Sequence, residues 1–143
     1  MTTLHIVLGV ALIAFNLAAG LLGTWSWWRV EPSRVFWPLL RIGQALVMIA
    51  AVQGGILVAM GEELPRLHLV YGLVPLGVAF LAEQLRLASA DTVLAARGLE
   101  GRADVERLSE DDQRSLVLAI VRRETGVMAA SALVVAALGV RAF

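Results

Sequence analysis

Apolar residues gather in four long stretches of the chain, at 4–23, 39–60, 67–87 and 126–141. A helix needs about 20 such residues to cross the hydrocarbon core of a bilayer, and the first three stretches meet that length. The fourth is shorter, but a helix over 115–141 that extends out of the bilayer would contain it. The pattern predicts an all-α integral membrane protein in which residues 1–143 form a single four-span domain.

The first stretch carries no formal charge, and no basic residue precedes it. A cleavable signal peptide begins with a basic region, so the sequence is not typical of one. We therefore interpret residues 4–23 as a span of the protein.

The connection between the first two stretches contains two prolines and all four tryptophans, Trp25, Trp27, Trp28 and Trp37. Tryptophan collects at the membrane–water interface because its ring is apolar and its N–H needs a partner. An interfacial belt is the favoured interpretation. The alternative is an aromatic docking surface for a quinone or a redox protein partner.

The two later connections differ in length and charge. Residues 61–66 form a tight turn, whereas 88–114 is a long charged segment. Near the end of that segment, Ser109 precedes three acidic residues, which is typical of a helix start because a hydroxyl caps free N–H groups there. We expect this helix to continue through Arg122 and Arg123 into the fourth span.

Arginine placement predicts the orientation. Arginines occur in the 24–38 connection and repeatedly in 88–123, whereas the N-terminus has none and the 61–66 turn has only Arg66. Because cytoplasmic loops carry an excess of basic residues, we expect both termini and the 61–66 turn to face outward. The charged segment 88–114 is then cytoplasmic, and the expected location is a bacterial plasma membrane.

The composition limits the classes of function. The chain is 59% hydrophobic with a formal net charge of zero, so no overall field attracts nucleic acid. It has no cysteine, which excludes disulfides, thiolate catalysis and iron–sulfur clusters. The expected partner is the lipid bilayer, with a homo-oligomer or a larger membrane complex as further options.

The only two histidines lie in nearly repeated segments, Leu-His-Ile-Val-Leu-Gly at 4–9 and Leu-His-Leu-Val-Tyr-Gly at 67–72. Each histidine opens a span that is followed by a returning helix. The chain therefore consists of two helical hairpins in the same orientation, which is a recurrent arrangement in membrane proteins. In an up-down-up-down four-helix bundle, the first and third helices lie diagonally and place His5 and His68 at similar depth.

Two histidines that face each other across a bundle suit the two axial positions of one haem iron. Gly9 and Gly72 each follow their histidine by one helical turn, on the same face, where a flat macrocycle needs a missing side chain. The alternative is that the histidines are incidental in the headgroup region and that the glycines serve helix–helix contact. A copper or zinc site fits less well, because no third ligand lies at a suitable spacing.

Three further residues are candidates for contact with a haem. Arg66 and Arg141 lie on the expected outer side, where arginine suits bidentate pairing with propionates, although either could instead be an interfacial snorkelling residue. Gln53 lies about two turns below the outer end of the second helix, near the ring or a neighbouring helix. We interpret the remaining buried polar residues, Asn16, Gln44 and Glu83, as forming interhelical hydrogen bonds.

The segment Gln-Gly-Gly-Ile-Leu-Val at 53–58, the Leu-Pro pair at 64–65 and then His68 resemble the haem A synthase family. The resemblance covers residues 40–86 and extends more loosely to His5. It implies that the chain corresponds to one four-helix half of such a protein, with His5 and His68 as ligands of a b-type haem.

The chain departs from this family around its first histidine. His5 is followed by Ile6 instead of the family's arginine, and no glutamate precedes it. The paired cysteines are also missing. The oxidation of the haem methyl group therefore does not carry over.

The sequence thus predicts a membrane haem-binding protein, a b-type cytochrome serving electron transfer or haem handling. Two histidine ligands leave no open iron position, so an enzymatic role is disfavoured. The alternative is a non-catalytic accessory or assembly subunit of a larger membrane complex. A small proton-coupled exporter is less consistent, because its embedded carboxylate would have to be Glu83, near the inner end of its span.

Overall fold

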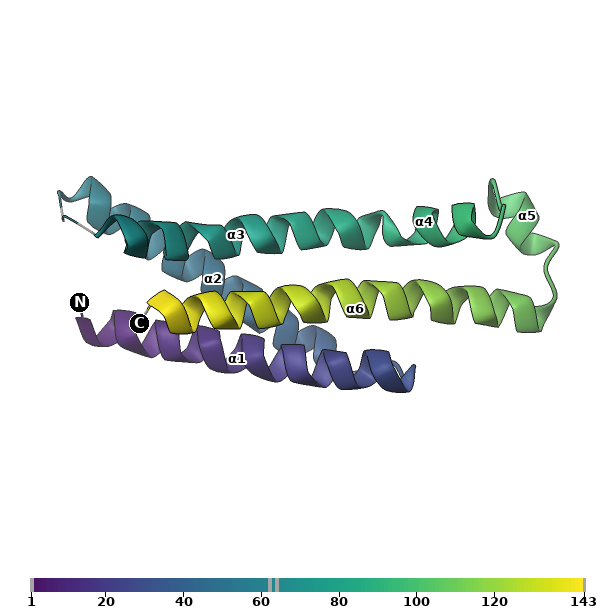
Figure 1. Ribbon diagram of the computed structural model, residues 1–143, viewed down its shortest axis with the longest axis horizontal. Coiled ribbons are helices and arrows are strands. Elements are labelled where there is room, and N and C mark those ends of the chain that lie inside the picture. Colours follow the sequence, from purple (N-terminus) through teal and green to yellow (C-terminus); the bar gives the residue numbers. More distant parts are fainter. Residues whose placement is uncertain (1, 62, 64, 143) are drawn as a thin grey trace.

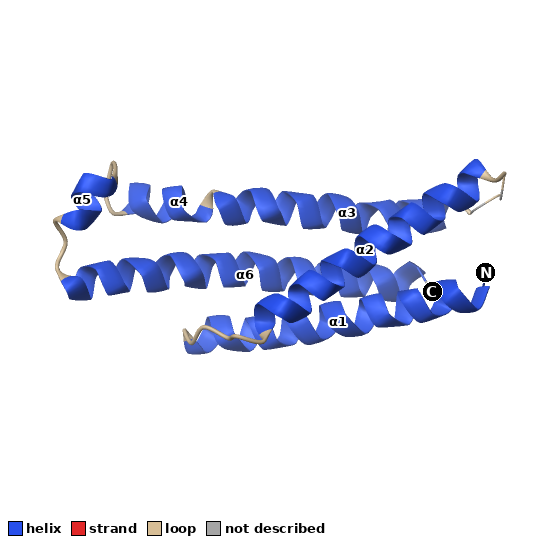
Figure 2. Cartoon of the chain, turned by 180° about the vertical axis from the view of Figure 1, so that it is seen from behind, coloured by secondary structure: helices blue, strands red, loops and turns tan. Residues whose placement is uncertain are grey.

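The computed structural model describes residues 2–61, 63 and 65–142. Over these residues the chain is helical and has no strand (Figures 1 and 2). The helices are α1 (Thr2–Arg29), α2 (Phe36–Ala59), α3 (Arg66–Leu87), α4 (Ser89–Ala96), α5 (Arg102–Glu106) and α6 (Glu110–Ala142). Four of them, α1, α2, α3 and α6, are long and apolar enough to cross a membrane, which confirms the predicted helical class and its four apolar helices.

Helix α1 extends further than the sequence predicts, through the first three tryptophans to Arg29. It ends at Val30, whose φ of 56° places it in the left-handed region. The N–H of Glu31 donates to the carbonyl of Ser26 at 3.2 Å, and the Ser26 hydroxyl donates to the Glu31 carbonyl. The first of these is the 6→1 bond of a Schellman cap, so a backbone turn ends the helix before Pro32 is reached.

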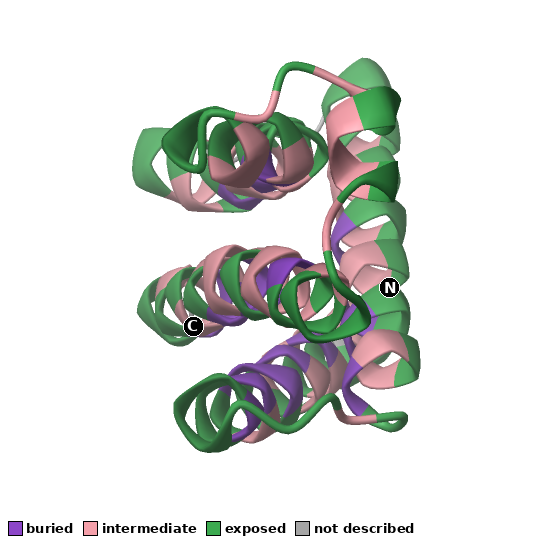
Figure 3. Ribbon diagram, turned by 90° about the vertical axis from the view of Figure 1, so that its right-hand side faces the viewer, coloured by how far each residue is buried: buried purple, intermediate pink, exposed green. Residues whose placement is uncertain are grey.

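The four long helices alternate in direction. Helices α1 and α3 run one way and α2 and α6 the other, so that both chain ends lie at the same end of the molecule as the α2–α3 connection (Figure 1). Helix α6 lies between α1 and α3, and α2 crosses this layer obliquely on one face (Figure 3). Helix α6 packs against both α1 and α3 and separates them along most of their length, and α1 packs about as extensively against α2 as α3 does against α6.

The interface between α1 and α6 is built from small residues. Ala19, Gly20 and Gly23 of α1 are buried, and they pack against Leu133 and the buried alanines of α6 at positions 129 and 132. A Cβ atom on Gly23 would lie 2.8 Å from the Cβ of Ala129 and would overlap the ring of Phe36. Small residues let two helix backbones approach closely, and dispersion contacts across such a seam hold helices together in a membrane.

The polar side chains of the long helices form hydrogen bonds both between helices and within one helix. As predicted, Gln44 of α2 donates to Glu83 of α3 at 3.0 Å, and Arg41 and Arg86 also bond this carboxylate. Asn16, which is 2% exposed, instead donates to the carbonyl of Leu12 in its own helix at 2.9 Å. The prediction of an interhelical hydrogen bond was therefore wrong for Asn16, because the close approach of Gly43 in α2 leaves its amide packed against backbone.

The charged segment after α3 forms a helical hairpin with the first half of α6. Helix α4 continues the direction of α3, and the pair α4 and α6 projects beyond the ends of α1 and α2 (Figures 1 and 2). Ser109 caps α6 as predicted, since its Oγ accepts from the N–H of Asp112 at 3.2 Å. The 33 residues of α6 run without a break through Arg122 and Arg123, which confirms the predicted long helix.

The α1–α6 seam predicts that Gly23→Ala lowers the free energy of unfolding by about 1–3 kcal/mol, because the added methyl group overpacks the site. Gly77→Ala in α3 is the matched control, since a Cβ atom there meets nothing within 4 Å. The control should be neutral or slightly stabilising. Unfolding in mixed micelles, followed by loss of helical circular dichroism, measures both variants, and equal effects would contradict the close seam.

Candidate functional site

The structure brings the two histidines together. His5 lies near the start of α1 and His68 near the start of α3, and their ring centroids are 5.4 Å apart with an interplanar angle of 52°. Because α1 and α3 run in the same direction, their first turns lie at the same end of the molecule (Figure 1). The pair joins side chains that are far apart in the sequence, on two helices that otherwise make little contact.

Three buried polar atoms near this end have no hydrogen-bond partner among the described residues. They are Nδ1 of His5 and both amide atoms of Gln53 in α2. A buried polar atom without a partner costs about 1–3 kcal/mol, so such atoms are uncommon in stable structures. They indicate either a bound group that satisfies them or a locally destabilised part of the fold.

Three glycines at this end are not used for close helix packing. A Cβ atom on Gly72 would meet nothing within 4 Å, and the same holds for Gly54 and Gly55 in α2. Gly9 is half-buried on α1. Gly72 therefore differs from Gly20 and Gly23, where helix contact explains the missing side chain.

The two arginines proposed for propionate pairing are exposed. Arg66 begins α3, and Arg141 lies in the last turn of α6. The first turn of α3 and the last turn of α6 belong to the histidine end of the molecule (Figure 1). All seven residues that the sequence singled out, namely His5, Gly9, Gln53, Arg66, His68, Gly72 and Arg141, thus lie toward this end.

The histidine pair is close to the geometry of axial ligation. Two imidazole nitrogens that each lie about 2 Å from one metal ion are about 4 Å apart, which places the ring centroids roughly 6 Å apart. The observed 5.4 Å is within 1 Å of that value. The open space beside Gly72 lies one turn further along the same helix as His68.

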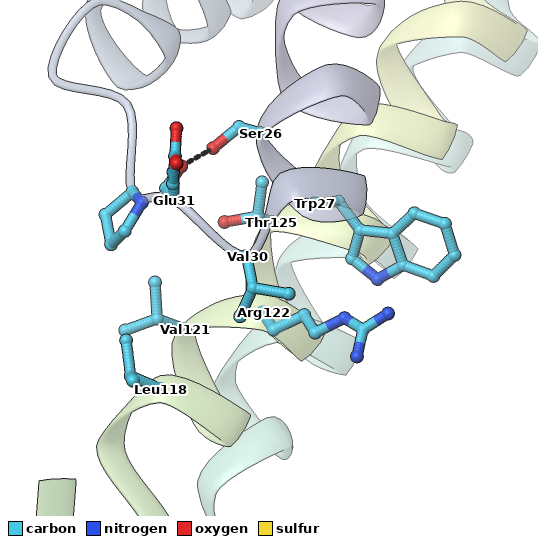
Figure 4. Close-up of a pocket in the computed structure, with 9 residues that line it drawn as sticks. Ser26, Trp27, Val30, Glu31, Leu118, Val121, Arg122 and Thr125 are labelled. Atoms are coloured by element: carbon cyan, nitrogen blue, oxygen red, sulfur yellow. Dashed lines mark hydrogen bonds between the residues drawn. The ribbon is translucent and has the colours of Figure 1, made fainter. Parts of the chain in front are cut away.

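Sequence reasoning missed a second region of interest, at the opposite end. An open cleft of about 660 Å³ lies between the end of α1, helix α4 and the middle of α6. Beside it, Ser26, Val30, Leu118 and Thr125 enclose a smaller hollow (Figure 4). The available signal was the recurrence of Arg97, Arg122 and Arg123 on the same side of the membrane as the tryptophans, which we used only for orientation.

Comparison with protein-family models, with curated proteins and with solved structures found no match. Within the described part of the chain, no cluster of three or more histidine, cysteine or acidic side chains is arranged to hold a metal ion.

The unpartnered amide of Gln53 predicts an unusual response to substitution. Gln53→Leu should raise the free energy of unfolding of the ligand-free protein by about 1–3 kcal/mol, because it removes two buried polar atoms without partners. Gln44→Leu is the matched control in the same helix and should lower it by about 1 kcal/mol, since Gln44 bonds Arg41 and Glu83. Chemical unfolding in micelles compares the two, and a destabilised Gln53 variant would show that the amide has a partner in solution.

Proposed function

We propose that this chain is a membrane haem-binding protein that holds one b-type haem through His5 and His68. Its function would be electron transfer or haem handling. The observation that carries the proposal is the meeting of the only two imidazoles of the chain, 5.4 Å apart, from the first turns of two parallel helices. An ionisable pair inside apolar helices is costly to place and is typical of a functional site.

The proposed membrane placement puts this site near the outer surface. Arg66 and Arg141 are the arginines at the histidine end, and the others lie toward the opposite end or in the projecting hairpin. By the positive-inside rule, the hairpin of α4 and α6 is then cytoplasmic and both termini face outward. Helix α6, at about 1.5 Å per residue, is long enough to cross the bilayer and extend into the cytoplasm.

Each candidate residue would make a different contact with the haem. His5 and His68 would supply neutral imidazole nitrogens to the two axial positions, and Gly72 would leave room for the macrocycle. Gln53 would contribute its unpartnered amide on the α2 side, and Arg66 and Arg141 would pair with the propionates as bidentate donors. When bound, the haem supplies one-electron redox chemistry, and filled axial positions favour electron transfer over oxygen activation.

The resemblance of residues 40–86 to the haem A synthase family supports His68 as a ligand more directly than His5. The structure supports His5 more directly, because the buried nitrogen without a partner among the described residues belongs to His5. The two arguments are independent: the resemblance supports His68 more directly, and the buried nitrogen supports His5 more directly.

A non-catalytic accessory subunit of a larger membrane complex is the second candidate function. It is favoured by the projecting hairpin and by the exposure of Trp25 and Trp28, the latter being 71% exposed. In that case the histidine pair would be structural, and the tryptophan-rich end would form the contact with the complex.

Protein purified from haem-replete cells should show a Soret band and a low-spin spectrum, because both axial positions are filled by imidazole. His5→Ala and His68→Ala should each lower the haem content at least about tenfold, as expected when metal binding loses a major contact. The absorption spectrum and the haem-to-protein ratio are the measurements.

Gly77→Ala is the control for these variants, since it lies in α3 in open space and should leave the spectrum unchanged. Wild-type protein that is folded and helical yet colourless would contradict the haem proposal and favour the accessory subunit. A Soret band that survives in both histidine variants would contradict the assignment of the ligands.

A further inference from the structure

The cleft at the end opposite the histidines is lined by arginine and tryptophan. Trp27 lies in the last turn of α1 and Val30 directly follows that helix, Arg97 directly follows α4, and α6 contributes Ser115, Arg122 and Arg123. Its volume is about 660 Å³, and it is broadly open to its surroundings instead of enclosed. Three separate helices therefore build one concave surface.

The charges in this cleft are all of one sign. Among the described residues that line it, the only charged side chains are the three arginines. None of the three lies within ion-pair distance of a described carboxylate. Like charges on one concave surface repel one another, and a bound anion would remove that cost.

Two of the arginines are held in position by the fold. The guanidinium of Arg122 lies 5.2 Å from the ring centroid of Trp27, and Figure 4 shows it beside the indole. Arg97 donates from Nη2 to the hydroxyl and the carbonyl of Ser115, at 3.1 and 3.4 Å. Fixed guanidinium groups suit phosphate, because their planar forks donate two hydrogen bonds to it at once.

The position of Trp27 is set by a glycine of α6. A Cβ atom on Gly126 would lie 2.8 Å from Nε1 and Cδ1 of the indole, so the ring keeps this position only beside a residue without a side chain. This contact places the indole over Arg122 and forms one wall of the cleft. One wall of the cleft thus depends on a specific packing contact between α1 and α6, whereas the arginine side chains that line it are exposed.

We infer that this cleft binds the phosphate-bearing headgroup of an anionic membrane lipid. It lies where α1 ends, at the level of the tryptophans, and the last two turns of α1 and the last turn of α3 expose leucines such as Leu21 and Leu85. A lipid could thus place its phosphate among the arginines and leave its acyl chains along apolar helix surface. The inference rests on the membrane placement proposed above, in which this end meets the anionic cytoplasmic leaflet, and it is independent of haem binding.

Lipid retention in native mass spectrometry tests the inference, with the full chain in micelles doped with phosphatidylglycerol or with phosphatidylcholine. Each wild-type molecule should retain one phosphatidylglycerol in preference to phosphatidylcholine. The double variant Arg122→Gln and Arg123→Gln should bind it at least about tenfold more weakly, because each arginine contributes to anionic-lipid binding. The control is Arg107→Gln with Arg114→Gln, which changes the net charge equally on the same hairpin but outside the cleft.

Equal losses in the two double variants would overturn the inference, because they would show general charge attraction. Displacement of the lipid by millimolar inorganic phosphate would also overturn it, since the occupant would then be a soluble phosphate. Trp27→Leu keeps every charge, and it is the test variant to use if circular dichroism shows that the double arginine variant does not fold. It should weaken retention of phosphatidylglycerol severalfold, and unchanged retention would contradict the role of the cleft.

Discussion

The close approach of α1 and α6 is the constraint on which the remaining structure depends. Glycine and alanine line both sides of the seam, and a methyl group added at Gly20 or Gly23 would overlap side chains across the interface. In a bilayer, where lipid tails are as apolar as leucine, such close contact is a main source of helix association. Because α6 packs closely against α1, α6 lies between α1 and α3. Helix α2 then crosses one face of the layer that these three helices form (Figure 3).

This arrangement gives the molecule two ends with different physical character. At the histidine end the helices are loosely packed, with open space at Gly72 and with buried atoms on His5 and Gln53 that have no partner among the described residues. At the opposite end, buried residues such as Phe36 and Met128 form a dense core next to the arginine-lined cleft. Polar groups lacking partners at one end, and cations of one sign at the other, are the features on which the two binding proposals rest.

Several features could be predicted from local sequence because their causes are local. The lengths of the apolar stretches predicted four long helices, and Ser109 with its acidic neighbours predicted the start of α6. The pairing of Gln44 with Glu83 also followed, because a polar residue within an apolar helix requires a partner. The end of α1 was missed because a backbone cap at Val30 ends it, and a valine in the left-handed region is not a recognisable stop signal.

The sequence by itself determined the helical class, the number of apolar helices and the repeated context of the two histidines, because these depend on residue type and on spacing along the chain. Only the tertiary structure decided that His5 and His68 meet and that α6 separates α1 from α3. It also decided that Trp27, Arg97 and Arg122 share one cleft. Such contacts join residues distant in sequence, and they depend on how closely the small side chains of α1 and α6 let the helices approach.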